Sequence, residues 1–402
     1  MVSPLEGVRV LDLSRVLSGP HCGRILSDLG ADVIKLEPPE GDGTRTAQPR
    51  IAGISVYFAQ QNAGKRNVSV DLQTADGARL ARALAARCDV LLENFRPGVL
   101  DRLGVGYGAV RAENPGIVYC SISGYGQDGP AARRRAYAPA IHAELGILEL
   151  AARRRGTDPV SEAFSHGDLY PATHAALAIV AALRHRDRTG EGQHIDISMA
   201  ETLLYVNEWA GTELAGGDRG MPHVFGGAYA PVLHMADGTW ICVPGNPVMM
   251  FPAWCRAMGR EDLLEDQRFA TPEDRQKHQP EMRALLQEWV GTFTDFDALE
   301  EALGRERLVV GAVRRVEEAA RSAWALARDS VAEVDDRAGG VLELPRPPWR
   351  FSTMETAVRA GPAWRGEHNR EVLRELLGMD EEEIEKLEAS SVISSRVYKE
   401  ET

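Results

Sequence analysis

Strand-like apolar segments alternate with helix-like segments between residues 7 and 123, and this order limits the fold more than any other feature. Residues 7–13 (G-V-R-V-L-D-L) have the pattern of a buried strand, residues 21–29 that of a helix and residues 31–37 that of a second strand. Ser18 to Pro20 are expected to break the chain before the helix. The alternation returns at residues 67–72, 76–87, 89–93 and 117–123. Such an order predicts an α/β fold with a Rossmann-like, doubly wound parallel sheet.

The second half of the chain has a different organisation. A helix is expected from Asp168 to about residue 184, and its apolar residues run nearly all round, which is typical of a buried helix. A strand at 194–198 and a helix at 199–214 follow. Residues 215–227 are rich in glycine and indicate a linker, and a hairpin turning at 236–238 opens a second, smaller α+β domain.

Length, charge and cysteine content narrow the class of protein. The chain has 402 residues, which suits two domains, and a formal net charge of −13, which disfavours a nucleic-acid-binding protein. We find no apolar run of about 20 residues that would span a bilayer and no signal peptide. The five cysteines form no C-x-x-C pair, so we expect neither a zinc site nor disulfides, and a cytoplasmic enzyme with reduced thiols.

The familiar nucleotide-binding motifs are missing. The turn after the first strand, S-R-V-L-S-G-P, holds a single glycine, so the fingerprint for NAD is absent, and no P-loop or zincin motif occurs. Arg96 and Arg102 follow the strand at 89–93, where an open α/β sheet binds ligands, and arginine suits phosphate groups. Ordinary surface arginines remain the alternative, and for Arg153 to Arg155 a surface turn competes with a site for a dicarboxylate.

Asp168 stands at the start of the long apolar helix and has two possible roles. Aspartate is a preferred N-cap, and Pro171 is tolerated in a first turn, so a structural cap is credible. The helix dipole and free N–H groups also favour an ionised carboxylate and can stabilise an oxyanion. A thioester is an activated acyl donor, so a carboxylate here suits covalent catalysis on a thioester. His166 and His174 flank Asp168, but their spacing does not match that of known metal ligands.

Several motifs together resemble the class III CoA-transferases, the family that includes carnitine, bile-acid and formyl-CoA transferases. The most specific are L-G-A-D-V-I-K-L-E-P-P-E-G-D, D-V-L-L-E-N-F-R-P-G-V-L-D-R-L-G, S-I-S-G-Y-G-Q-D-G-P and G-D-L-Y-P-A-T-H-A-A-L-A-I-V-A-A-L. They occur in the order typical of the family and span nearly the whole chain. The resemblance implies a large domain built from both termini, here residues 1–215 and 331–402, a small α+β domain at 216–330, and an interlocked homodimer.

The resemblance also implies a chemistry that uses an acyl-CoA donor and a free carboxylic-acid acceptor, without a metal or NAD. Asp168 would attack the acyl-CoA to form a mixed anhydride, and the released CoA thiolate would then form an aspartyl-CoA thioester. The implied coenzyme A contacts are Val16, Val70, Asp71, Leu72, Gln73, Asn94, Phe95, Arg96, Arg102, Arg135 and Tyr137.

Some positions depart from the family pattern. Leu17 replaces a glutamine of formyl-CoA transferase, and only Gly226 and Gly227 stand where that enzyme has a longer glycine run, which disfavours oxalate as acceptor. Pro38 replaces a basic residue, and Ala138 an aspartate found in many members. A 2-methylacyl-CoA racemase is the nearest alternative, but it pairs the aspartate with a histidine where this chain has Tyr137, a poor base near neutral pH. A non-catalytic CoA-binding protein is a further alternative.

Overall fold

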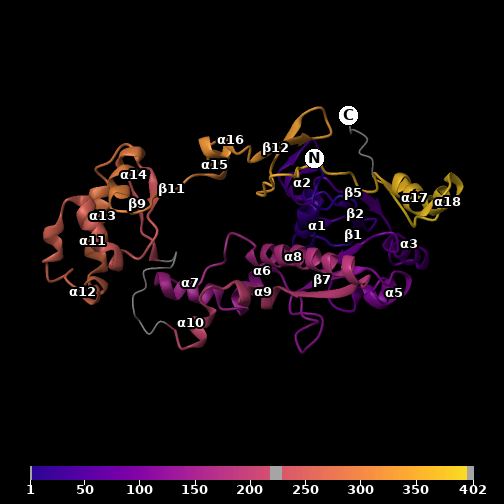
Figure 1. Ribbon diagram of the computed structural model, residues 1–402, viewed down its shortest axis with the longest axis horizontal. Helices are drawn as coiled ribbons and strands as arrows, with labels where there is room; N and C mark the ends of the chain where they lie inside the picture. Colours follow the sequence, from indigo (N-terminus) through magenta and orange to yellow (C-terminus); the bar gives the residue numbers. More distant parts are fainter. Residues whose placement is uncertain (1, 218–228, 396–402) are drawn as a thin grey trace. The chain divides into compact units, whose positions relative to one another are not determined.

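A six-stranded parallel sheet forms the centre of the larger unit of the chain (Figure 1). The computed structural model describes residues 2–217 and 229–395. Along the sheet the strands follow the order β5-β2-β1-β6-β7-β8, and every neighbouring pair is parallel. The predicted α/β fold with a parallel sheet is therefore confirmed. The strands are β1 (Arg9–Asp12), β2 (Asp32–Glu37), β5 (Arg66–Ser69), β6 (Val90–Glu93), β7 (Val118–Ser123) and β8 (Gln193–Ser198).

The chain order of these strands creates a switch point between β1 and β6. From β1 the chain moves outward to β2 and β5, and then returns to the other side of β1 to form β6, β7 and β8. Crossover loops therefore leave the carboxyl ends of β1 and β6 in opposite directions, and a crevice for ligands opens between them. The central strands are buried on both faces, as an apolar parallel sheet requires.

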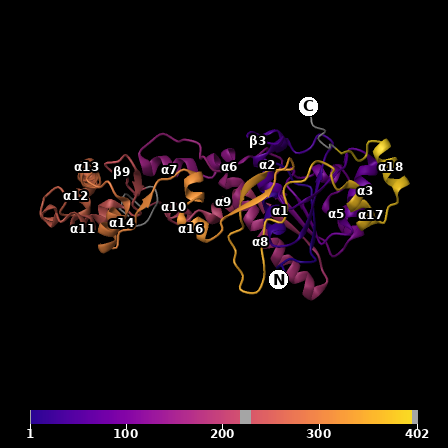
Figure 2. The same cartoon turned by 90° about the horizontal axis from the view of Figure 1, so that it is seen from above.

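Helices pack on both faces of this sheet. On one face α3 (Ala75–Ala85), α5 (Tyr107–Glu113) and α17 (Asn369–Leu377) cover Leu11 and Leu91 in a shared apolar core. Elsewhere α1 (Ser18–Asp28) packs along α8 (His166–Thr189), and α8 also contacts α9 (Met199–Val206) (Figure 2). Shorter elements connect these: η1 (Gly43–Thr46), β3 (Arg50–Ile51), β4 (Ile54–Ser55), α2 (Val56–Asn62), α4 (Val99–Arg102) and α6 (Ala138–Glu144).

Three local predictions are wrong. Ser18 to Pro20 do not break the chain but form the first turn of α1, where proline is tolerated because its missing N–H has no helical partner. The helix expected at 199–214 is two helices, α9 and α10 (Ala210–Leu214), separated at residues 207–209. The long helix α8 is not buried all round, since Leu177 is 68% exposed in the single chain.

The C-terminal segment packs onto the larger unit. It contributes α16 (Ala323–Ala327), the antiparallel pair β12 (Val331–Asp335) and β13 (Val341–Pro345), α17 and α18 (Glu381–Ala389). Leu342 and Leu344 of β13 share a core with Ile54 of β4 and Ala59 of α2. Asn369, at the start of α17, accepts a hydrogen bond from the Ser69 N–H at 2.8 Å, which joins the C-terminal segment to the end of β5.

A smaller unit consists of residues 146–160 and 208–322, and the larger one of residues 1–145, 161–207 and 323–402. The predicted hairpin is confirmed, with β9 (Val232–His234) antiparallel to β10 (Trp240–Cys242) beside β11 (Gly311–Ala312). Part of the predicted linker, including Gly226 and Gly227, lies outside the described residues, and the boundaries at 215 and 330 stay predictions. The helical elements of the smaller unit are α7 (Ile147–Arg155), α10, α11 (Pro247–Met258), η3 (Glu261–Leu264), α12 (Pro272–Lys277), α13 (Gln279–Val290), α14 (Phe296–Arg305) and α15 (Val316–Ala320). Within the described ranges, no helix is long and apolar enough to cross a bilayer.

Candidate functional site

Asn94 joins the loops that follow β1 and β6 at the switch point of the sheet. Its Oδ1 accepts a hydrogen bond from the Arg15 N–H at 2.9 Å, and its Nδ2 donates to the Arg15 carbonyl at 2.7 Å and to Ser18 Oγ at 3.0 Å. Both ends of the amide are thus engaged by the protein itself. Asn94, which the resemblance placed at the coenzyme, therefore orders the two loops that frame the crevice.

A cavity of about 90 Å³ lies at the carboxyl edge of the sheet. Asp71, Leu72, Gln73 and Phe95 line it, so the fold brings these four predicted coenzyme residues together. Val70 differs from them, because its side chain is only 1% exposed and belongs to the apolar core. Only the backbone of Val70 can face a ligand, and its N–H already donates to the Glu37 carbonyl at 2.8 Å.

Cationic residues occur in the segments that follow the strands of this edge. The predicted Arg96, Arg102 and Arg135 are exposed, and none of their side chains makes a hydrogen bond or ion pair with another described residue. Arg15 also lines the cavity and lies over the Phe95 ring, with its guanidinium carbon 4.2 Å from the ring centroid. Sequence reasoning missed Arg15, although it directly follows the first strand. Free guanidinium groups at a strand edge are suited to the phosphates of an anionic ligand.

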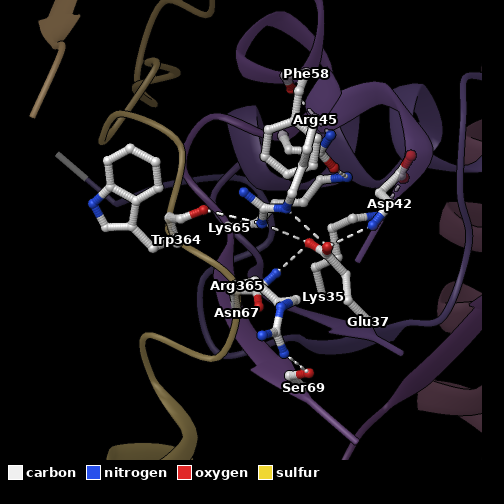
Figure 3. A network of polar contacts seen from close by, with 12 residues as sticks. Lys35, Glu37, Asp42, Arg45, Phe58, Lys65, Asn67, Ser69, Trp364 and Arg365 are labelled. Carbon is white, nitrogen blue, oxygen red and sulfur yellow. Dashed lines mark hydrogen bonds and ion pairs between the residues drawn. The ribbon is translucent and has the colours of Figure 1, made fainter. Parts of the chain in front are cut away.

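A buried network of ionic groups supports the loop between β2 and η1 (Figure 3). Arg45 donates two hydrogen bonds to the Glu37 carboxylate, from Nε at 2.8 Å and from Nη2 at 2.7 Å. The Asn67 amide donates to the same carboxylate at 2.6 Å. Burial opposes ionisation of Glu37, but the hydrogen bonds and charge of Arg45 outweigh it, so the pKa of Glu37 is lowered. Asp42 accepts a hydrogen bond from the Val16 N–H at 3.2 Å and lies 3.2 Å from Lys35 Nζ.

Val16 is held in an unusual backbone conformation by this network. Its φ of 70° lies in the left-handed region, which a β-branched residue rarely adopts. The hydrogen bond from its N–H to the buried Asp42 carboxylate stabilises that conformation. The Val16 side chain is 38% exposed, so the predicted coenzyme residue is available to a ligand. Strained positions of this kind are concentrated at functional sites.

Lys65 has a structural role as the partner of the buried Asp12 at the end of β1. Its ammonium group donates to Asp12 Oδ2 at 2.8 Å, to the Pro20 carbonyl at 2.8 Å and to Asn62 Oδ1 at 3.0 Å. Burial lowers the pKa of Lys65 to about 8 against the opposing effect of Asp12. Both side chains are almost fully buried, so Lys65 is not one of the cations that a ligand can reach.

Asp168 lies in the first turn of α8, three residues after the N-cap. Ser165 is the N-cap and makes no side-chain capping bond, so of the two roles considered for Asp168 the N-cap is excluded. Pro171 lies inside the helix and not in its first turn. Burial raises the pKa of Asp168 to about 6, and a hydrogen bond from the backbone of Ala138 opposes this shift. The carboxylate is therefore more basic than an exposed one and still ionised at neutral pH.

Helix α6 packs closely on the start of α8 and positions Asp168. A Cβ atom on Gly167 would lie 3.0 Å from the Ala138 Cα, so a larger residue would require the two helices to move apart by a few tenths of an ångström. On the next turn of α6, His142 Nε2 accepts a hydrogen bond from the Gly167 N–H at 2.9 Å. The histidine thereby takes the place of the missing N-cap side chain. Because Nε2 accepts a hydrogen bond, the ring proton resides on Nδ1 and His142 is neutral. Its pKa is lowered, mainly by burial and to a smaller extent by the charge of His166.

Replacing His142 by methionine is expected to destabilise the protein. The Gly167 N–H would be buried without an acceptor, which costs about 1–3 kcal/mol. His142→Gln supplies an amide oxygen near the position of Nε2 and should restore part of that loss. Thermal unfolding of the two variants, followed by calorimetry, checks this. Equal melting temperatures for the methionine and glutamine variants would show that the bond to Gly167 contributes nothing.

Tyr57 is influenced by the charge of the Asp168 carboxyl group, and sequence reasoning did not identify it. Its pKa is raised by burial and then by the charges of Asp168 and Asp42. The phenol therefore stays protonated at neutral pH. Tyr137, a predicted residue, is the N-cap of α6 directly before Ala138 and is 65% exposed. Within the described part of the chain, no group of three or more acidic, histidine or cysteine side chains is arranged to hold a metal.

Known proteins resemble this chain over nearly its whole length. Residues 5–369 match the family model of CoA-transferase family III. Succinyl-CoA–D-citramalate CoA-transferase of Chloroflexus aurantiacus is 34% identical over 400 residues, which cover 97% of this chain and 98% of that protein. Formyl-CoA:oxalate CoA-transferase of Streptomyces avermitilis is 33% identical over 413 residues, which cover 98% of this chain and 100% of that protein. A crystal structure of a CAIB/BAIF family protein from Brucella suis matches with a TM-score of 0.81 at 32% sequence identity. The match covers 94% of this chain and 100% of that one.

Proposed function

Because the chain belongs to CoA-transferase family III, we propose that it transfers coenzyme A from an acyl-CoA to a free carboxylic acid, with Asp168 as the nucleophile. The observation that carries this proposal is the Asp168 carboxyl group in the first turn of α8, with its raised pKa and the Ala138 backbone bonded to it. Its position at a helix start beside a backbone hydrogen bond suits attack on a carbonyl group.

The proposed reaction proceeds through two kinds of covalent intermediate. The Asp168 carboxylate attacks the thioester carbonyl, which breaks the C–S bond and yields a mixed anhydride and the CoA thiolate. The thiolate attacks the Asp168 carbonyl, which releases the first acid and forms an aspartyl-CoA thioester. The acceptor carboxylate attacks the carbonyl of that thioester, which breaks its C–S bond, forms a second anhydride and again releases the CoA thiolate. The thiolate then attacks the acyl carbonyl that came from the acceptor, which breaks the anhydride C–O bond, forms the new acyl-CoA and regenerates the Asp168 carboxylate.

The raised pKa of Asp168 makes this nucleophile more effective. A carboxylate of pKa about 6 is a stronger nucleophile than one of pKa 3.8, because nucleophilicity rises with basicity. At neutral pH most of the group is still ionised, so little of this gain is lost to protonation.

Coenzyme A is proposed to lie along the carboxyl edge of the sheet. Asp71, Leu72, Gln73 and Phe95 line the cavity there, and the side chains of Arg96, Arg102 and Arg135, which have no partner among the described residues, would bind its phosphates. Asn94 is proposed to act indirectly, by ordering the loops that frame the crevice. The exposed side chain of Val16 is available for contact with the coenzyme. The relatives described above are named for succinyl-CoA and formyl-CoA as donors, so we propose a short-chain acyl-CoA donor.

We propose a homodimer in the cytoplasm. Tyr170 and Leu177 of α8, and Leu204 and Tyr205 of α9, expose large apolar side chains in the single chain, as expected for a surface covered by a second copy. The five cysteines are free thiols, which is typical of a reducing compartment. The interlocking of two chains remains part of this proposal.

The rate of acyl-enzyme formation should fall about tenfold per pH unit below pH 6 and should be nearly constant from pH 7 to 8. Only the ionised carboxylate attacks, and burial places the Asp168 pKa at about 6. Rapid-quench measurements with saturating succinyl-CoA check this, while CoA binding over the same pH range separates affinity from ionisation. An inflection near pH 4 would contradict the buried environment of Asp168.

Trapping the intermediates tests the proposed function. We expect hydroxylamine to convert Asp168 to a hydroxamate after incubation with a competent acyl-CoA, detected by intact-protein and peptide mass spectrometry. A panel of acyl-CoA donors then identifies the substrate. Absence of an adduct with every donor, together with exchange of the α-proton in deuterated water, would instead support a racemase. Binding of CoA without either signal would support a non-catalytic role.

A further inference from the structure

Strand β6 ends in a buried carboxyl group that the proposed mechanism does not use. Glu93, the last residue of the strand, is only 5% exposed. Its Oε2 accepts a hydrogen bond from the Phe95 N–H at 2.7 Å. Phe95 lines the cavity at the carboxyl edge of the sheet, and Arg15 lies over its ring. Glu93 therefore holds the backbone of a residue that forms a wall of the proposed coenzyme site.

Glu93 differs from other buried carboxylates near this edge, because no lysine or arginine of the described residues forms an ion pair with it. Asp12 is paired with Lys65 at 2.8 Å, and Asp42 with Lys35 at 3.2 Å. Burial of a carboxylate without a counterion is costly. An apolar residue at the end of this buried strand would avoid that cost. A carboxyl group in this position therefore indicates a role other than stability.

Ser121 and His194 connect Glu93 to the surface. Ser121 lies opposite Glu93 in the register of β6 and β7 and forms a hydrogen bond with its carboxyl group. The Ser121 Oγ also lies 2.9 Å from Nε2 of His194, an exposed residue of β8. A hydroxyl group donates one hydrogen bond, so Ser121 donates to an ionised Glu93, or accepts from a protonated Glu93 and donates to His194. The same three residues thus accommodate both protonation states of Glu93.

The charge on Glu93 changes near neutral pH. Burial raises its pKa to about 7 against the effect of its two hydrogen bonds, and the charges of Asp101 in α4 and Asp196 in β8 raise it further. Three further titratable groups interact with Glu93 or with Ser121, and they are neutral at pH 7 because burial shifts their pKa values away from ionisation: Tyr119, Cys120 and His194. A carboxylate is a stronger acceptor than a neutral acid, so the bond from the Phe95 N–H is strongest when Glu93 is ionised.

We propose that Glu93 is a positioning residue for coenzyme A, whose carboxylate fixes the Phe95 N–H and thereby sets the shape of the coenzyme cavity. This inference rests on the proposed binding of coenzyme A at this edge. Because Glu93 is buried, it acts through Phe95 and not by contact with the coenzyme. Asn94 ties the same loop to the loop after β1, whereas Glu93 ties it to the sheet.

Calorimetric titration of the full chain with CoA at pH 8 tests this role. Glu93→Met should weaken CoA binding about tenfold, because the Phe95 N–H loses its acceptor. Glu93→Gln keeps a neutral acceptor of the same shape and should bind about threefold more weakly than the wild type. Acyl-enzyme formation at saturating donor should stay within about twofold of the wild-type rate, because Asp168 keeps its surroundings. The matched control is Glu113→Gln, which replaces an exposed carboxylate of α5 and should leave CoA affinity unchanged.

The pH dependence of CoA binding separates the charge of Glu93 from its shape. At pH 6 most of the wild-type Glu93 is protonated, because its pKa is about 7, so wild type and Glu93→Gln should bind CoA equally. At pH 8 Glu93 is ionised and the wild type should bind more tightly. Titration of the CoA phosphates is common to both proteins and cancels in the comparison. Tighter binding by Glu93→Gln at pH 8 would show that the carboxylate repels the coenzyme and would overturn the proposal.

Thermal unfolding distinguishes positioning from a role in the fold. At pH 8 an ionised Glu93 with a raised pKa opposes folding, so Glu93→Met should melt no lower than the wild type. Weaker CoA binding together with a large loss of stability would assign Glu93 to the fold and contradict the proposal. Equal CoA binding by wild type and Glu93→Met would overturn the role of Glu93 alone, whereas absence of CoA binding by the wild type would overturn the proposed function as well.

Discussion

Asp168→Asn is expected to lower the rate of CoA transfer by about four orders of magnitude or more, and to leave no hydroxylamine-trapped adduct. Loss of a covalent nucleophile has effects of this size because the entire reaction sequence depends on it. Asparagine keeps the shape of the side chain and retains an acceptor for the Ala138 backbone, so the fold should persist. Steady-state transfer and intact-protein mass spectrometry measure the two effects. The matched control is Asp187→Asn, an exposed aspartate of the same helix, which should remain fully active.

The same substitution is expected to stabilise the protein at pH 8. A carboxyl group whose pKa rises from 3.8 in the unfolded chain to about 6 in the folded one opposes folding whenever it is ionised. This cost is absent below about pH 4, grows between pH 4 and 6 and is constant above, where it amounts to about 2–3 kcal/mol. Asp168→Asn should therefore melt at a higher temperature than the wild type at pH 8 and at a similar temperature at pH 4.

Loss of transfer without this gain in stability would mean that Asp168 is needed but is not held in an apolar environment. A gain in stability with full activity would remove Asp168 from the mechanism. The two measurements thus test the nucleophile and its environment separately. Functional groups that oppose folding are common at active sites, where catalysis and stability conflict.

Lys65→Met is expected to destabilise the larger unit by about 3–5 kcal/mol, because it leaves the Asp12 charge buried without its counterion. Both partners are at most 1% exposed, and their atoms lie 2.8 Å apart. Among the described residues, Asp12 would keep only its bonds to Ser14, one of which is from the Ser14 N–H at 3.0 Å. A Cβ on Gly23 would lie 2.6 Å from Asp12 Oδ2, so α1 packs tightly against this pair and leaves little room for water.

The double variant Asp12→Asn, Lys65→Met separates charge from packing. It removes both charges and should recover much of the lost stability, since a neutral pair of similar size is often tolerated in a core. Denaturant unfolding monitored by circular dichroism provides the comparison. Lys386→Met breaks an exposed pair with Glu382 and should change stability by less than about 1 kcal/mol. Equal destabilisation by the single and double variants would show that shape, and not charge, decides the effect of Lys65.

The parallel sheet could be predicted because its signal is local. Apolar strands of four to six residues, each followed by a helix pattern, require a parallel arrangement, and the right-handed crossover leaves few alternatives. The errors occurred where one residue type suits two structures. Ser18-Gly19-Pro20 resembles a turn, but proline is equally suited to the first turn of a helix, and Gly19 is needed there because its Cβ would lie 2.1 Å from the Ser14 Cβ.

The candidate site was only partly visible in the sequence. Asp168 could be identified from its place at a helix start and from the resemblance to a family, yet its position after the N-cap could not. His142 and Tyr57 carry no signal of their own, because they belong to other helices, 26 and 111 residues before Asp168 in the chain. Arg154 was visible only as part of an arginine run for which a surface turn was expected, whereas it lies in the last turn of α7 with its guanidinium against Trp209.

The sequence by itself determined the order of strands and helices, the family and the identity of the candidate nucleophile, because periodicity and motifs are properties of neighbouring residues. Only the tertiary structure decided the pKa of Asp168 and the cap that His142 provides. These depend on burial and on distances between segments far apart in the chain. An aspartate becomes more basic only when particular segments exclude water around it.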